Sequence, residues 1–170
     1  SRGLGDVYKR QVYNHVYNAA NHSFNKTVPG YYFRYDDNGS LVNNSGCGND
    51  TASERKMMRK YIVDSVTYWA KNYNVDGFRF DLMGLIDTET MKEVRAALDE
   101  IDPSIIILGE GWDMNTTMDE GEMTIQPNAY QVASDGTNNG IAFFNDSVRD
   151  GLKGSVFSDT CLLYTSDAAD

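Results

Sequence analysis

Two short apolar runs constrain the fold more than any other feature of this 170-residue chain. They occupy residues 75–82 and 105–108, and each follows a stretch with helical periodicity, residues 53–73 and 87–101. Helix and strand therefore alternate along the chain. Because runs of this kind suit strands that are buried on both faces, the order predicts an α/β fold with a parallel sheet.

The stretches around these runs predict further elements. In the first helical stretch, apolar residues recur at helical spacing and predict the face that packs on the sheet. They are Met57, Tyr61, Val63, Val66, Trp69 and Ala70. Thr88 is a candidate N-cap of the second helix. Residues 18–50 and 113–138 lack sustained periodicity and predict long irregular loops, the second followed by a short helix near residues 145–152.

Both ends of the chain differ from its middle. One permitted coding of residues 6–11 has a reverse complement that, in a shifted frame, encodes residues 161–165 and the start of the next codon. The ends are thus compatible with an inverted repeat, and they resemble translated transposon adapters used in sequencing libraries. We therefore interpret residues 1–11 and 161–170 as adapter-derived, not native, and expect the folded segment to be residues 12–160.

Composition excludes several classes of partner. The net charge is −10 without a basic stripe, which argues against nucleic acid or an anionic membrane and suits a neutral polyol. Cys47 is the only cysteine in residues 12–160, so neither an intrachain disulfide nor a cysteine metal site is expected there. No apolar run approaches the roughly 20 residues that span a bilayer. The compartment and the oligomeric state stay undetermined.

The first apolar run carries two charged groups on one face. In a strand, the two-residue period sends Phe78 and Phe80 to one side and Arg79 and Asp81 to the other. Burying two ionised groups is costly unless they pair or serve a site. The pattern alone leaves both possibilities open: a structural ion pair, or a functional site.

The second run also ends at a carboxylate, because Glu110 follows residues 105–108 after a single glycine. In a parallel barrel the carboxyl ends of the strands hold the active site, so this group and Asp81 would point into one pocket. The alternative is that Glu110 is a helix-capping or loop carboxylate.

The spacing of two such groups suits one kind of chemistry. Neighbouring strands lie about 4.7 to 4.9 Å apart, and the two carboxyl groups of a retaining glycosidase lie about 5 to 5.5 Å apart. One carboxylate attacks the anomeric carbon while the other protonates the leaving oxygen. Asp81 is the candidate nucleophile, Glu110 the candidate acid/base, and Arg79 the group that aims Asp81.

Near the start of the chain, residues 12–15 predict the end of another strand, with His15 near the rim of the pocket. A lone histidine is a weak signal. His15 and His22 each have an alternative interpretation as a hydrogen-bonded structural histidine or a loop residue.

Together, three segments resemble, in order and spacing, the first three signature regions of the alpha-amylase family of glycoside hydrolases, glycoside hydrolase family 13. They are residues 12–15, 77–81 and 109–112. The acidic residue that the family has just ahead of the first region is missing, since the segment interpreted as adapter stands there.

Within that family, the chain most resembles type I pullulanases, which debranch starch. Residues 82–84 after the candidate nucleophile, Trp112 after the candidate acid/base, and residues 45–49 carry this resemblance. It implies a partial (β/α)8 TIM barrel of about three strand-helix units around strands 3 to 5. It also implies retaining cleavage of alpha-1,6-glucosidic branch linkages in pullulan, amylopectin and limit dextrins.

The resemblance assigns roles to further residues. His15 and Arg79 are implied to hold the sugar at the cleavage subsite, and Tyr13 and Trp112 are further candidate substrate-binding residues. Tyr17 could also offer an aromatic face to a pyranose ring.

Parts of the family's machinery have no counterpart here. The third catalytic carboxylate of the family is absent before Thr160, and the missing strands would leave sheet edges unpaired, so the chain alone is expected to be poorly folded and inactive. No metal ligand is predicted and no cofactor is expected to be required, although some relatives bind calcium near the loop after His15. The resemblance leaves the bacterial cytoplasm and secretion equally open.

Three alternatives remain at this point. One is another hydrolase of the same family, an amylase or an isoamylase that acts on a different linkage. Another is a non-catalytic relative that binds carbohydrate or serves as a structural subunit. The last is an unspecialised α/β domain.

Overall fold

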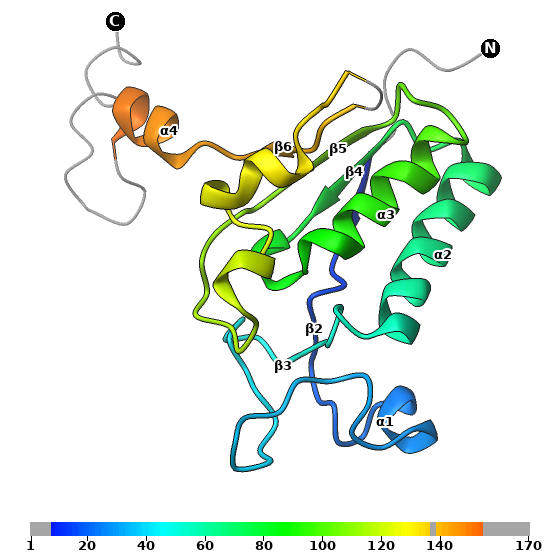
Figure 1. The fold of residues 1–170 in the computed structure, drawn as a ribbon, viewed down its shortest axis with the longest axis vertical. Coiled ribbons are helices and arrows are strands. Elements are labelled where there is room, and N and C mark those ends of the chain that lie inside the picture. Colours follow the sequence, from blue (N-terminus) through cyan, green and yellow to red (C-terminus); the bar gives the residue numbers. More distant parts are fainter. Residues whose placement is uncertain (1–7, 137–138, 155–170) are drawn as a thin grey trace, which may run out of the picture.

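A four-stranded parallel sheet forms the centre of the computed structural model, which describes residues 8–136 and 139–154 (Figure 1). The strands follow one another across the sheet in the order β1–β4–β5–β6. They span Tyr8–Gln11 (β1), Gly77–Phe80 (β4), Ile106–Gly109 (β5) and Ala142–Phe143 (β6). The predicted α/β fold with a parallel sheet is confirmed. Strand β6 was not predicted, because two residues are too few to show a period.

Two helices make the crossovers and cover one face of the sheet (Figure 1). Helix α2 (Lys56–Tyr73) precedes β4, and helix α3 (Thr88–Asp99) connects β4 to β5. The two helices pack on each other. Their buried apolar side chains meet those of the strands in one core, which includes Met58, Ile62, Val66, Met91, Val94, Leu98, Phe78, Phe80 and Ile107.

The buried face of α2 differs in part from the predicted one. Met58 and Ile62 are buried with Val66, whereas Met57 and Tyr61 are 48% and 44% exposed. Each mispredicted residue is followed by another apolar residue, about 100° further around the helix. Spacing alone cannot choose between two such neighbouring stripes, and only the position of the sheet decides.

The N-terminus of α3 is capped one residue earlier than expected. Asp87, not Thr88, is the N-cap: its side chain accepts a hydrogen bond from the backbone N–H of Thr90 at 2.9 Å. The same carboxylate accepts a hydrogen bond from Arg59 of α2 at 3.0 Å. The cap therefore also ties the two helices together.

The sheet begins earlier in the chain than expected. Residues 1–11 were excluded from the fold, but Tyr8–Gln11 pairs in parallel with Gly77–Phe80. The strand thus ends at Gln11, ahead of residues 12–15, where its end was predicted. Strand pairing does not test the origin of the segment, so its adapter origin stays a prediction. Residues 1–7 and the second proposed adapter segment, 161–170, lie outside the described residues.

Residues 18–50 are irregular, as predicted, but they are anchored at several points. Helix α1 (Ser23–Thr27) is short, and β2 (His15–Val16) pairs in antiparallel fashion with β3 (Asn49–Asp50). Buried Arg34 donates hydrogen bonds to Glu54 at 2.8 Å and to the carbonyl of Leu85 at 2.8 Å. The loop is therefore fixed against the residues just before α2 and against the segment after β4.

The second irregular stretch contains two 3-10 helices, η2 (Glu120–Glu122) and η3 (Gln126–Val132). A third, η1 (Met83–Leu85), follows β4 directly. The short helix predicted near residues 145–152 is confirmed as α4 (Asp146–Lys153), with Asn145 as its N-cap.

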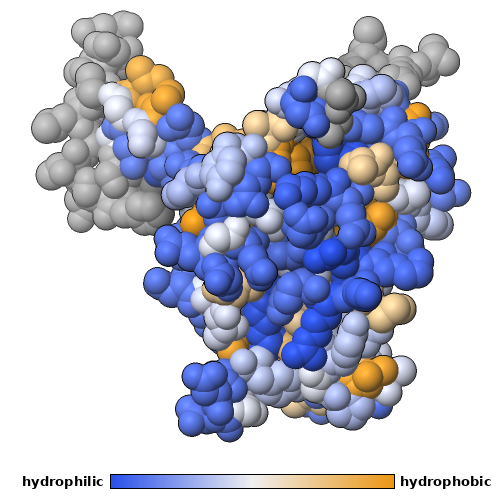
Figure 2. Space-filling view, viewed as in Figure 1, coloured by the Kyte–Doolittle hydropathy of each residue, from blue (hydrophilic) through white to orange (hydrophobic). Residues whose placement is uncertain are grey.

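The surface is mostly hydrophilic on the face that Figure 2 shows, with small apolar patches. One patch lies on α4, where Val148 and Leu152 are exposed. Among the helices that the structure describes, none combines the length and the apolar character that crossing a membrane requires.

The other face of the sheet has less cover than predicted. The strands were expected to be buried on both faces, but Ile106 of β5 is 44% exposed, while its neighbour Ile107 is buried under the helices. Within the described residues, helices cover one face only, so this part of the prediction was wrong.

Candidate active site

The charged residues of β4 lie where the strand period predicts. Phe78 and Phe80 are fully buried in the core under the helices. Arg79 points to the opposite side, where its guanidinium bonds Asp81 at the end of the strand. The carboxylate of Asp81 is also close to fully buried. The alternation therefore separates packing residues from charged residues within a single strand.

One guanidinium joins the two candidate catalytic carboxylates. Arg79 donates from Nη1 to Asp81 Oδ1 and from Nη2 to Glu110 Oε1, the second at 2.5 Å. The two acids follow paired strand ends, since Phe80 of β4 is in register with Gly109 of β5. Parallel pairing thus brings side chains 29 positions apart in the sequence onto one cation.

The segment after Asp81 is folded sharply around Glu110. Leu82 is in the left-handed region, with φ 44° and ψ 48°, which costs a residue other than glycine about 1 kcal/mol or more. In this conformation its backbone N–H donates to Glu110 Oε2 at 2.9 Å. Glu110 therefore also holds the loop after β4, as the alternative interpretation proposed, in addition to its ion pair with Arg79.

Gly84 permits the close packing of this loop on the segment after β5. Its N–H donates to the carbonyl of Glu110 at 3.0 Å. A Cβ atom at Gly84 would lie 2.0 Å from the carbonyl oxygen of Trp112. Any side chain here would therefore push apart the two loops that carry the candidate acids.

His15 is connected to Asp81 through Asn14. Asn14 is fully buried, and its Nδ2 donates to the backbone carbonyl of Asp81 at 2.5 Å. Its Oδ1 lies 2.5 Å from Nδ1 of His15, which is partly exposed. The sequence interpretation singled out His15 but missed Asn14. The signal available in the sequence was an amide side chain directly before a candidate site histidine.

Arg10 was missed because its segment had been excluded. Its Nε donates to both oxygens of Asp81, at 2.8 and 2.6 Å, although its side chain is 69% exposed. In the structure, Asp81 thus lies between two guanidinium groups, those of Arg10 and Arg79. An arginine occupies a segment where the family resemblance leads one to expect an acid.

The structure does not place Tyr13 with these groups. Its ring packs in the core against Phe80, and its hydroxyl hydrogen-bonds Ser65 of α2 at 2.7 Å. Burial raises the pKa of Tyr13 to about 12. The geometry argues against a contact between Tyr13 and a sugar, since it packs with Phe80 on the side away from Arg79.

Trp112 does lie beside one of the two carboxylates, that of Glu110. A cavity of about 360 Å³ is lined by Arg79, Glu110 and Trp112. Its remaining wall comes from the two residues between β6 and α4, Phe144 and Asn145, and from Asp146 and Arg149 of α4. The sequence interpretation gave this wall no role, because its helical pattern carries no chemical signature. Tyr17, the other aromatic candidate, is 90% exposed and does not line this cavity.

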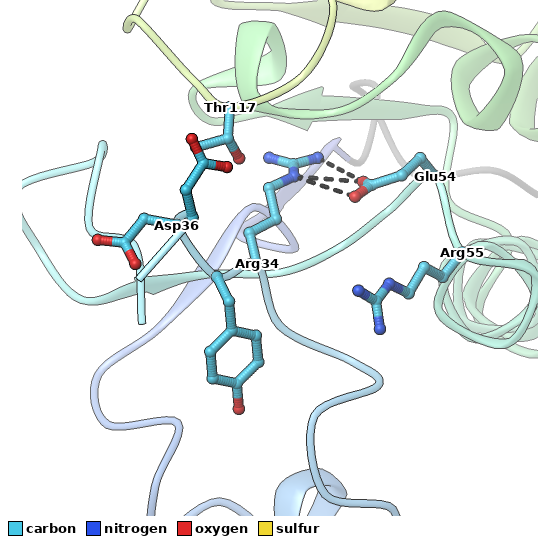
Figure 3. Close-up of a pocket in the computed structure, with 7 residues that line it drawn as sticks. Arg34, Asp36, Glu54, Arg55 and Thr117 are labelled. Carbon is cyan, nitrogen blue, oxygen red and sulfur yellow. Dashed lines mark hydrogen bonds and ion pairs between the residues drawn. The ribbon is translucent and has the colours of Figure 1, made fainter. Parts of the chain in front are cut away.

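A larger hollow, of about 470 Å³, lies between the loop of residues 18–50, the residues before α2 and the irregular stretch after β5 (Figure 3). Arg34, Asp36, Glu54, Arg55 and Thr117 line it, together with Tyr35 and Asp37. Its most buried charges are paired with each other, as the hydrogen bonds in Figure 3 show. These pairs fix the loop, and none of the candidate catalytic residues borders the hollow.

Residues 8–136 and 139–154 contain no group of three or more His, Cys, Asp or Glu side chains arranged to hold a metal ion. Calcium binding was left open by the sequence. That no ion is required therefore stays a prediction.

Comparisons with known proteins give consistent matches, although no protein-family model matches the sequence. The chain is 47% identical over 146 residues to the pullulanase of Bacillus subtilis, covering 86% of the chain and 20% of that protein. It is 42% identical over 159 residues to the chloroplastic pullulanase 1 of Arabidopsis thaliana, covering 86% of the chain and 16% of that protein.

A solved structure agrees. The pullulanase of Anoxybacillus sp. LM18-11, crystallised with maltotriose, superposes with a TM-score of 0.84 at 55% identity, covering 90% of the chain and 21% of that protein. The chain spans about a fifth or less of the length of these relatives.

Proposed function

The chain is homologous to one segment of the type I pullulanases, and on that premise we propose that it is part of the catalytic domain of a starch-debranching glycoside hydrolase. The complete enzyme would cleave alpha-1,6-glucosidic linkages in pullulan, amylopectin and limit dextrins. Relatives crystallised with maltotriose and with maltose support an alpha-glucan as the substrate class.

The domain we propose is a (β/α)8 barrel, of which this segment supplies neighbouring strands. Parallel strands that follow each other in chain order, with helices on one face only, support this proposal. The uncovered face would then be the barrel interior, which side chains from the remaining strands fill.

We propose a retaining mechanism with Asp81 as the nucleophile. Its carboxylate attacks the anomeric carbon, the bond to the leaving glucan breaks, and a covalent glycosyl-enzyme forms. Glu110 first donates a proton to the departing glycosidic oxygen. It then removes a proton from the water that releases the sugar and regenerates Asp81.

The observation that carries this assignment is the shared contact of both acids with Arg79. Two carboxylates held by one guanidinium at the ends of adjacent strands must lie close together, as the separation of about 5 to 5.5 Å in retaining glycosidases requires. A wider pair, about 6.5 to 9.5 Å apart, would leave room for a water and favour inversion.

Arg79, His15 and Trp112 are the proposed substrate-binding residues. Arg79 would hold Asp81 in line for attack, and His15 would contact the sugar at the cleavage subsite. Trp112 would offer an apolar face to a pyranose ring beside Glu110. We do not extend this proposal to Tyr13, given its place in the core.

The decisive experiment needs the complete enzyme. For every test below, this means the full-length protein that carries the segment, or the Bacillus subtilis pullulanase with its matching 146 residues replaced by those of this chain. It should release maltotriose from pullulan, whereas an alpha-1,4 amylase would not. The 170-residue chain alone should give no measurable hydrolysis. Turnover on alpha-1,4 linkages only would favour the amylase alternative.

A non-catalytic relative is the second alternative. It would bind maltotriose in the complete protein without releasing any product from pullulan, amylopectin or limit dextrins. The contact of Asp81, Arg79 and Glu110 favours the enzyme, because a binding module has no need for two acids on one guanidinium.

A further inference from the structure

We propose that Asn14 is a positioning residue that fixes the tautomer and the orientation of His15 and ties it to the main chain of Asp81. In this arrangement His15 carries its proton on Nδ1 and presents a bare Nε2 as a hydrogen-bond acceptor. The tautomer follows from the contacts of Asn14 alone. Only its use, accepting a sugar hydroxyl, rests on the proposed function.

The orientation of the Asn14 amide is set by its surroundings. The side chain is fully buried, and one end lies 2.5 Å from the carbonyl oxygen of Asp81. An amide oxygen at that position would face another acceptor, so the NH2 group must lie there. The main chain of Asn14 is also held, because the N–H of Thr51 donates to its carbonyl at 3.0 Å.

The amide oxygen then faces His15. Oδ1 of Asn14 is an acceptor without a hydrogen, and it lies 2.5 Å from Nδ1 of His15. A neutral imidazole has one N–H, so this contact requires the proton on Nδ1 and leaves Nε2 unprotonated. The backbone of His15 is fixed by its pairing with Asp50 across β2 and β3.

His22 provides an internal reference with the opposite arrangement. Its Nδ1 accepts a hydrogen bond from the backbone N–H of Phe24, at 3.2 Å, as the N-cap of α1. The proton of neutral His22 must therefore be on Nε2. The chain has only two histidines, and the structure assigns them opposite tautomers.

This arrangement makes Nε2 of His15 a hydrogen-bond acceptor in the site. A bare Nε2 accepts a hydrogen bond from a sugar hydroxyl, which Lys or Arg in the same place could not do. The same amide holds the carbonyl of Asp81, so the acceptor and the proposed nucleophile are fixed through one buried side chain. Asn14 acts through His15 and Asp81 and does not itself touch the substrate.

The tautomers can be read directly by nitrogen-15 NMR of the histidine-labelled chain, in alkaline buffer where imidazole is neutral. We expect one ring with the proton on Nδ1 and the other with the proton on Nε2. His22→Gln removes the second signal and so assigns the first to His15. Finding the proton of His15 on Nε2, or the same tautomer in both rings, would overturn the proposal.

Two substitutions separate the roles of the amide. Asn14→Ala removes the acceptor and should shift His15 towards a mixture of tautomers, while His22 is unchanged. Asn14→Asp keeps an acceptor for His15 but cannot donate to Asp81, so the Nδ1 proton should remain. Asn72→Ala is the matched control: an exposed amide on α2 that also donates to a backbone carbonyl, that of Tyr68 at 2.8 Å. A His15 tautomer that is unchanged in Asn14→Ala would contradict the proposal.

The contribution to function is measured in the complete enzyme. Asn14→Ala should raise KM for pullulan about tenfold, the scale of one hydrogen bond, and Asn14→Asp should raise it less. Equal KM values in both variants would refute the link between the tautomer and the sugar. Absence of all hydrolysis in the unsubstituted enzyme would instead refute the proposed function, and the NMR result would stand independently.

Discussion

The two faces of the central sheet differ in what their side chains do. On the face under α2 and α3, Phe78, Phe80 and Ile107 are packed into the core. On the other face, the same strands carry Arg79 in contact with two acids, and partly exposed Ile106. Strands with a period of two thus divide stability and chemistry between alternate residues. Substitutions on the covered face should therefore lower stability, whereas substitutions among the charged residues of the other face should lower activity.

The largest effect is expected for Asp81→Asn in the complete enzyme. The amide cannot attack the anomeric carbon, so kcat on pullulan should fall by about a thousandfold or more, in line with the loss of a nucleophile. The melting temperature should fall only modestly, because the amide oxygen of Asn still accepts hydrogen bonds from Arg10 and Arg79, and Arg79 keeps its ion pair with Glu110. Turnover within tenfold of the unsubstituted enzyme would disprove the nucleophile assignment.

The next largest effect is expected on the covered face, for Phe80→Ala. Removing a fully buried ring should lower the free energy of unfolding by about 3 to 5 kcal/mol. Urea denaturation of the chain, followed by circular dichroism, measures this loss. A cost below about 1 kcal/mol would mean that this face is not the core.

The pH dependence of stability tests whether Tyr13 is buried on the covered face. Its pKa is raised from 10.0 to about 12, because burial disfavours the phenolate. Below pH 10 the hydroxyl is protonated in both states, and its contribution to stability is fully present. Between pH 10 and 12 only the unfolded chain loses the proton, so the free energy of unfolding should fall by about 1.4 kcal/mol per pH unit.

Tyr13→Phe is the comparison that isolates this residue among 11 tyrosines. It should cost about 0.5 to 1.5 kcal/mol at neutral pH, through the lost hydrogen bond with Ser65, and should show a shallower alkaline decline. Urea denaturation at several pH values gives both quantities. Parallel declines for the two proteins would show that Tyr13 titrates as it does in the unfolded chain.

The smallest effect is expected for Ile106→Ala on the open face of the isolated chain. Since Ile106 is 44% exposed, the cost should stay below about 1 kcal/mol. In the complete enzyme, a barrel interior would cover this residue, and the cost should rise to about 2 to 5 kcal/mol. A small cost in both proteins would argue against the proposed barrel.

The predictions from the sequence agree best with the structure where a local period determines which way a side chain points. Alternation along β4 was enough to place Phe80 and Arg79 on opposite faces, because successive strand residues must point apart. The order of helices and strands was enough for a parallel sheet. Met57 and Tyr61 were misplaced because neighbouring apolar stripes of α2 look alike until the sheet selects one.

The candidate site also divides into residues that local sequence reveals and residues that only tertiary contacts reveal. Asp81 and Glu110 were found because each ends an apolar run. Asn14 was not, since a contact with Asp81 across 67 positions leaves no trace in local spacing. Arg10 was not, since its segment had been excluded from the fold. Tyr13 was expected near the sugar, but its ring packs in the core. The next residue, Asn14, is the one that faces Asp81.

The sequence by itself determined the type and order of the main elements, the side of each strand that carries charge, and the two acids, because these depend on contacts within a few residues. Tertiary structure alone decided which stripe of α2 is buried, that residues 8–11 pair with β4, and that Arg79 touches both acids. These facts depend on how distant segments pair, and pairing is set by the free energy of the whole packed chain.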